Sequence, residues 1–125
     1  MGFDIYGATR LPWLTKPEHI QEHTREHIMW QISVGRYFRA GAGSWKPIYE
    51  LIVKANDTHG LNFNLRKWDS NDKAGLNTPE DCTKLADAMS KLITDEDYLE
   101  IEDFDVSHTA HFIQFLYNTC AFQIA

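Results

Sequence analysis

Two amphipathic segments in the C-terminal half constrain the fold most strongly, and both predict helices. In the first, Thr78 precedes Pro79. This order is typical of a helix start, because threonine accepts a hydrogen bond from a first-turn N–H and proline fits the first helical position. Apolar residues then recur at helical spacing from residue 84 to residue 93, and again along one side of residues 107–120. The chain is therefore expected to be mainly helical.

Shorter alternating runs predict a small sheet beside these helices. Residues 3–6 and residues 37–40 alternate between apolar and polar side chains, as strands with one buried face do. Residues 61–65 alternate as well, and predict either a strand or an ordered loop. A further helix is expected over residues 47–54, after a turn at residues 41–44. The sequence thus predicts one α+β domain formed by all 125 residues, with three to five helices and a small sheet of short strands.

Near the N-terminus, a Glu-His dipeptide occurs three times at a spacing of four residues. Thr15 and Pro17 predict the start of a helix that runs through the three dipeptides, over residues 17–33. On such a helix the histidines would form one row beside a row of glutamates, because residues four apart share a face. The dipeptides are Glu18-His19, Glu22-His23 and Glu26-His27.

This predicted histidine row fits three uses, which the sequence leaves open: a metal site, a pH-responsive helix, or a helix face that meets solvent or a partner. The pattern H-x-x-E-H occurs twice within it and is found in one group of zinc peptidases. A helix rises about 1.5 Å per residue, so His19 and His27 would lie about 12 Å apart, too far to bind one ion. An adjacent pair would need a ligand from elsewhere, best supplied by His108 or His111. We expect no bound cofactor; the alternative is zinc held among His19, His23, His27, His108 and His111.

The negative charge is concentrated in one segment. Residues 92–125 contain seven acidic side chains and no lysine or arginine, in a chain whose net charge is −6. Repulsion from phosphate makes this segment a poor contact for nucleic acid, and we expect no nucleic-acid partner. Thr94 predicts a short helix at the start of residues 95–105, which are expected either to be solvated or to bind a protein with a basic surface. The candidate partner-binding residues are Asp95, Asp97, Glu100 and Asp103.

Composition excludes several classes of protein. Apolar content of 43% and aromatic content of 13% argue against disorder, and no apolar run approaches the about 20 residues of a membrane span. The N-terminus lacks the features of a secretory signal, so we expect a cytoplasmic protein without a membrane partner. Cys82 and Cys120 are then expected to be free thiols. No nucleophile motif appears, so an enzyme is not favoured.

Several charged residues stand among large aromatic residues. We expect Arg39 or Lys46 to pair with Asp4 or Asp72, because charges that become half-buried need partners. Such pairs would fix the N-terminal strand and the loop at Asp72 onto the core. The alternative is that the same side chains surround a pocket and hold a small polar ligand.

Four short blocks of the sequence resemble a family of small uncharacterised bacteriophage and bacterial proteins. That family opens with MG-x-DIYG and continues with G-x-YFR, W-x-RP-L and NDG-x-G blocks. The chain departs from the pattern at Lys46, where arginine is usual, and at Lys73, where glycine is usual. The resemblance implies a phage context but no particular activity. The matching blocks are Met1-Gly2-Phe3-Asp4-Ile5-Tyr6-Gly7, Gly35-Arg36-Tyr37-Phe38-Arg39, Trp45-Lys46-Pro47-Ile48 and Asn71-Asp72-Lys73-Ala74-Gly75-Leu76.

Two functions follow as hypotheses. The first is a non-enzymatic accessory protein of phage type that binds another protein, with residues 95–105 and the Glu-His segment, residues 17–33, as its surfaces. The second is a small metal- or ligand-binding protein that uses the N-terminal histidines together with His108 and His111. The oligomeric state and the identity of the partner are not predicted.

Overall fold

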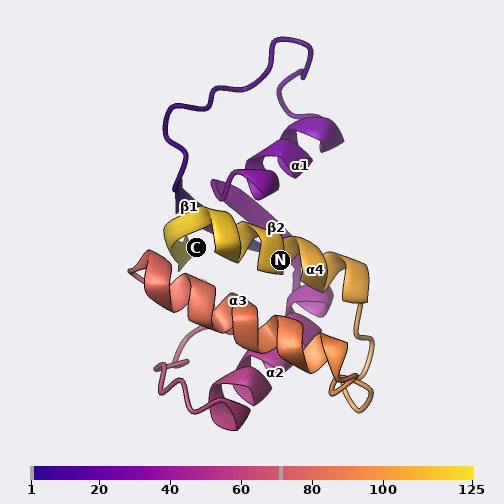
Figure 1. Cartoon of the computed structure of the whole chain (residues 1–125). Coiled ribbons are helices and arrows are strands. Elements are labelled where there is room, and N and C mark those ends of the chain that lie inside the picture. Colours follow the sequence, from indigo (N-terminus) through magenta and orange to yellow (C-terminus); the bar gives the residue numbers. More distant parts are fainter. Residues whose placement is uncertain (1, 71) are drawn as a thin grey trace.

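A three-stranded antiparallel sheet and four helices make up the part of the chain that the structure, a computed structural model, describes: residues 2–70 and 72–125 (Figure 1). This architecture confirms the predicted α+β class. The elements in chain order are β1 (Gly2–Thr9), α1 (Arg25–Ser33), β2 (Tyr37–Gly41), α2 (Ala42–Thr58), α3 (Pro79–Thr94), α4 (Val106–Asn118) and β3 (Thr119–Ile124).

The sheet has one buried face and one open face. Its strand order is β2-β1-β3, so the N-terminal strand lies in the centre. Ile5 is paired with Phe38 on one side and with Ile124 on the other, and all three side chains are buried. Strand residues alternate in direction, so Tyr6 and its partner Tyr37 project from the opposite face. The buried face therefore meets the helices, and the face that carries the tyrosines is open.

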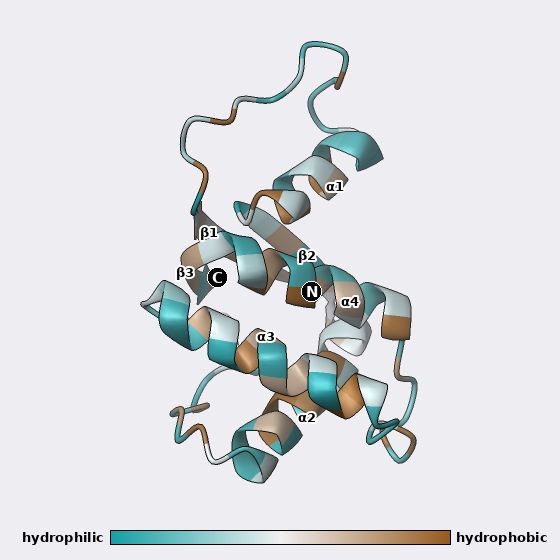
Figure 2. Ribbon diagram, viewed as in Figure 1, coloured by the Kyte–Doolittle hydropathy of each residue, from teal (hydrophilic) through white to brown (hydrophobic). Residues whose placement is uncertain are grey.

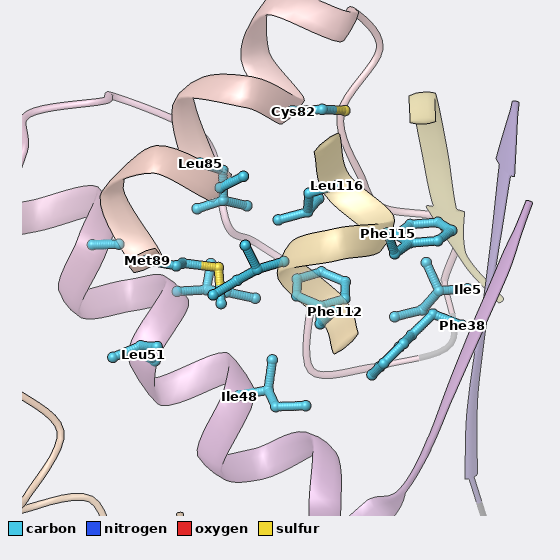
Figure 3. Packing of buried hydrophobic residues seen from close by; sticks show 14 of the residues in the cluster. Ile5, Phe38, Ile48, Leu51, Cys82, Leu85, Met89, Phe112, Phe115 and Leu116 are labelled. Atoms are coloured by element: carbon cyan, nitrogen blue, oxygen red, sulfur yellow. The ribbon is translucent and has the colours of Figure 1, made fainter. Parts of the chain in front are cut away.

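The hydrophobic core lies between this sheet and α2, α3 and α4. Figure 3 shows Phe112 and Phe115 of α4 between the sheet residues and the apolar side chains of α2 and α3. The ring centroid of Phe112 lies 5.1 Å from that of Phe38 and 5.4 Å from that of Trp45. Along α3 and α4 hydrophilic residues alternate with hydrophobic ones, as the predicted amphipathic patterns require (Figure 2). The helix-start prediction at residue 78 is also confirmed, because the Thr78 hydroxyl accepts from the N–H of Asp81.

The end of the chain differs from the prediction. The last helix was expected to reach residue 120, but α4 ends at Asn118. Strand β3, which the sequence did not predict, follows directly from Thr119. Residues 61–65 form a loop, the second of the two predicted alternatives. The loop near Ala74 covers the outer edge of β3. The carbonyl oxygen of Ala74 accepts a hydrogen bond from the N–H of Ile124 at 2.7 Å. The strand exists because both of its edges find backbone partners, which the local sequence does not encode.

The predicted helix over residues 17–33 is also wrong in its first half. Helix α1 begins only at Arg25, and Thr24 caps it by accepting from the N–H of His27 at 3.2 Å. His23 has a φ of +64°, a left-handed conformation that a continuous helix does not contain. The glutamates and histidines before it lie in turns, so the predicted histidine row does not form.

Helix α1 is held close to the edge of the sheet and to α4. Gly35, two residues after the end of α1, has a φ of +74°, which glycine adopts without strain. A Cβ atom at this position would lie 2.2 Å from the carbonyl oxygen of Asn118, so no other residue fits without displacing the backbone. The chain therefore passes tightly against the end of α4 and then enters β2. This passage places the N-terminal turn of α1 opposite the histidines of α4.

Candidate functional site

Two adjoining hollows form one groove between α1, the open edge of the sheet and α4. Their volumes are about 400 and about 410 Å³, and His23, Ile28 and Arg39 line both of them. We call this region the histidine groove. Its basic lining consists of His23, Arg25, His27, Arg39, His108 and His111.

Two of the histidines come from the first turns of α4. The carboxylate of Asp105 caps this helix by accepting from the N–H of His108 at 3.0 Å. The imidazole of His108 stacks on Phe38, with 5.1 Å between ring centroids, and its Nε2 lies 3.2 Å from the carbonyl oxygen of Arg39. His111 follows at a spacing of three and so lies on the same side of α4. Helix α4 and strand β2 thus fix one wall of the groove.

The other wall is formed at the start of α1. The Nδ1 atom of His27 accepts from the backbone N–H of His23 at 3.3 Å. An imidazole that accepts through Nδ1 carries its proton on Nε2, so the free nitrogen of His27 is a hydrogen-bond donor. The same ring stacks on Trp30 with a centroid distance of 6.3 Å, which restricts its rotation. The left-handed backbone of His23 therefore has a role: it turns the chain so that both imidazoles reach the groove.

The charges that line the groove are unbalanced. Neither Arg25 nor Arg39 forms an ion pair or a side-chain hydrogen bond with any residue in the described part of the chain. No aspartate or glutamate is among the described residues that line the two hollows. Asp4 lies opposite Arg39 in the strand register, but its carboxylate accepts a hydrogen bond from the hydroxyl of Tyr37. The lining of the groove therefore presents donors and positive charge, and the carboxylate of Asp4, opposite Arg39 in the strand pairing, is a negative group beside it.

Tyr37 stays neutral in this environment. Burial, followed by the hydrogen bond to Asp4, raises the pKa of its phenol to about 12. The phenol consequently remains a donor to Asp4 across the physiological range.

The structure brings four of the five predicted metal ligands together. His23, His27, His108 and His111 converge on one groove, whereas His19 lies in the exposed loop before α1 and does not line it. Among the residues 2–70 and 72–125, no group of three or more His, Cys, Asp or Glu side chains is arranged to hold a metal ion.

The predicted ion pairs of Arg39 and Lys46 do not form. Asp72 forms its ion pair with Lys67 instead, with 2.8 Å between Nζ and Oδ2. The carboxylate of Asp4 accepts a hydrogen bond from the hydroxyl of Tyr37. The error has a physical cause: Arg39 is on the open face of the sheet and exposed to solvent, so burial does not force it to find a partner. Both side chains line hollows, as in the alternative, but separate ones: Arg39 lines the histidine groove, and Lys46 lines a hollow beside Phe3 and Trp45.

The acidic segment is a loop rather than the predicted short helix. We call residues 95–105 the acidic loop; Glu96 and Asp103 have positive φ, which ends helical structure there. Lys91 pairs with Asp95 at 3.2 Å, and Lys54 pairs with Glu100, so two of the four candidate partner-binding carboxylates already have partners. The other two candidates, Asp97 and Asp103, are exposed.

Both cysteines are free thiols, as predicted. Cys82 is buried in α3, and this burial raises the pKa of its thiol to about 12. A thiol with such a pKa carries almost no thiolate at neutral pH and is a poor nucleophile.

No protein-family model, no curated protein and no solved structure matches this chain. The resemblance to phage and bacterial proteins therefore stays a prediction. None of the helices in the described residues is long and apolar enough to pass through a bilayer.

Proposed function

We propose that this protein is a non-enzymatic binding protein whose histidine groove holds a small oxyanion of the phosphate class. The observation that carries the proposal is the composition of the groove: two arginines without ion-pair partners and four histidines, with no carboxylate among the described lining residues.

The donor set suits an oxyanion. Guanidinium groups present planar pairs of N–H donors that match phosphate oxygens, and charge-assisted hydrogen bonds are stronger than neutral ones. Imidazoles add donors, and His27, whose Nδ1 accepts a backbone hydrogen bond, has its Nε2–H as a donor. The two hollows have volumes in the range of about 300–1,000 Å³ that is typical of small-molecule sites.

The remaining charge of the protein limits the size of the ligand. A net charge of −6 repels an extended polyanion, and the acidic loop immediately precedes the helix that carries His108 and His111. A compact anion that contacts only the groove avoids most of this repulsion. The proposal is therefore a small anion rather than a nucleic-acid chain.

Calorimetric titration with pyrophosphate tests the proposal. We expect one binding site per chain and an affinity that falls as ionic strength rises, because salt screens the attraction between the groove and the anion. Absence of binding at low ionic strength would refute it.

A second function is favoured by one feature of the acidic loop. Leu99 is 73% exposed, although it lies between carboxylates in a loop whose neighbours are well packed: Ile101 is buried, and Tyr98 stacks on Phe104 at 4.8 Å. An exposed leucine on an acidic loop suits a protein partner with an apolar pocket and a basic rim. This is the accessory-protein function, and the phage resemblance would make the partner a bacterial protein.

Neutral substitutions in the acidic loop test this second function. Because Asp95 and Glu100 already have lysine partners, the variant replaces the unpaired carboxylates and the exposed leucine: D97N, L99A, E102Q and D103N. We expect the wild type to capture a protein from a bacterial lysate at low salt and to release it at high salt. The variant should fold normally but should not capture that protein. The control, D57N with E80Q, removes exposed carboxylates elsewhere and should keep the capture. If both variants capture the same proteins as the wild type, the loop is only a solvated surface.

A further inference from the structure

The anion that the groove holds, we infer, carries an aromatic ring that stacks on Tyr6, so that the ligand class is a nucleoside monophosphate. This inference rests on the proposed anion-binding function and extends it from the charged end of the ligand to the rest of the molecule.

Tyr6 offers an exposed aromatic surface at the groove. It belongs to the central strand, projects from the open face of the sheet and is 55% exposed, which is unusual for a large aromatic side chain. Its cross-strand partner Tyr37 lies beside it, with 5.4 Å between ring centroids and 46° between ring planes. The hydrogen bond from Tyr37 to Asp4 holds this second ring in place. The two rings form a supported platform with one accessible ring.

The platform and the positive charge share one hollow. Tyr6, His27 and Arg39 all line the hollow of about 400 Å³. Arg39 lies two residues beyond Tyr37 on β2, so it is the diagonal neighbour of Tyr6 across the strand pair, at about 7–8 Å. A flat ring on Tyr6 therefore leaves an attached phosphate within reach of the guanidinium and the imidazole.

One further polar side chain is placed to meet the ring edge. Gln31 of α1 lines the same hollow and has no hydrogen-bond partner for its side chain among the described residues. Its amide offers both donors and an acceptor, which are the groups that a nucleobase edge pairs with. Stacking on an aromatic face tolerates any base, whereas the amide would add selectivity. The aromatic platform therefore suits the face of a nucleobase, the amide suits its edge, and the cationic groups suit the phosphate.

The competing ligand of the same charge is a free phosphate, and a three-ligand comparison distinguishes the two. We would measure the affinities of adenosine 5′-monophosphate, inorganic phosphate and adenosine for the full-length protein. Base stacking predicts that adenosine 5′-monophosphate binds about tenfold or more tightly than inorganic phosphate. In Tyr6→Ala the ratio of the two affinities should fall to about one, and in Tyr6→Phe it should stay near the wild-type value, because phenylalanine keeps the stacking surface.

Trp13→Ala serves as the matched control. Trp13 is also a highly exposed aromatic residue, at 70%, but it does not line the groove, so its loss should leave the ratio unchanged. Equal affinity of the wild type for adenosine 5′-monophosphate and inorganic phosphate would overturn the nucleotide inference and leave the anion site standing. A ratio that survives Tyr6→Ala would overturn it too. Failure of both phosphate ligands to bind would overturn the proposed function itself.

Discussion

Replacing Phe112 with alanine is expected to lower the free energy of unfolding by about 3–5 kcal/mol. The side chain is 0% exposed and lies where the sheet, α2 and α4 meet (Figure 3). Its ring contacts Phe38 and Trp45, and it also meets Phe122 of β3 at 6.2 Å. Alanine would leave a cavity among rigid aromatic side chains, which cannot collapse to fill it. Denaturant unfolding monitored by circular dichroism measures the loss.

Leu99→Ala is the control for this prediction. Leu99 is also apolar but mostly exposed, so its truncation should change the free energy of unfolding by less than about 0.5 kcal/mol. If Phe112→Ala cost as little as Leu99→Ala, the described packing between the sheet and the helices would be incorrect.

Removing both groove arginines, in R25Q/R39Q, is expected to weaken pyrophosphate binding by about 100-fold or more. A hydrogen bond to a charged group contributes about 1.5–3 kcal/mol, and two are lost. Neither guanidinium has an ion-pair partner in the described residues, so the free energy of unfolding should stay within about 0.5 kcal/mol of wild type. Calorimetric titration of the variant gives the affinity.

The matched control removes the same charge elsewhere. R66Q/K84Q replaces two exposed cationic side chains that lie outside the groove. Net charge is then equal in the two variants, and only R25Q/R39Q should lose affinity. Equal weakening in both would mean that pyrophosphate responds to overall charge and not to a site.

The helices of the C-terminal half could be predicted because local signals specify them. The Thr78 cap, Pro79 and the apolar periodicity all favour the same helix, and tertiary packing buries the side that the pattern marks. Strands β1 and β2 were predictable for the same reason, since their alternation matches the buried face of the sheet. Strand β3 was not, because its apolar residues continue the preceding helix and only pairing with β1 and with the loop at Ala74 determines its conformation.

The sequence identified several residues of the histidine groove but did not predict the groove itself. The sequence singled out the histidines on both segments and identified Arg39, but it placed the first three histidines on one helix. That helix starts late because Thr24 caps it: the Thr24 side chain accepts a hydrogen bond from a first-turn N–H that another helical turn would otherwise bind. The left-handed conformation of His23 then prevents the helix from extending toward the N-terminus. His23 and His111 line the same hollow because α1 packs against α4. This packing is a tertiary contact, and no local sequence pattern predicts it. Tyr6 and Tyr37 carried no signal as a pair until the strand register was known.

In the proposed site, four of the six histidines surround one anion, and side-chain ¹H–¹⁵N NMR during a phosphate titration at constant pH follows each of these imidazoles separately. We expect the imidazole signals of His23, His27, His108 and His111 to shift together and to saturate with one dissociation constant. The signals of His19 and His59, which do not line the groove, should stay in place. Unchanged signals for the four groove histidines, or equal drift of all six, would mean that the histidine groove is not an anion site.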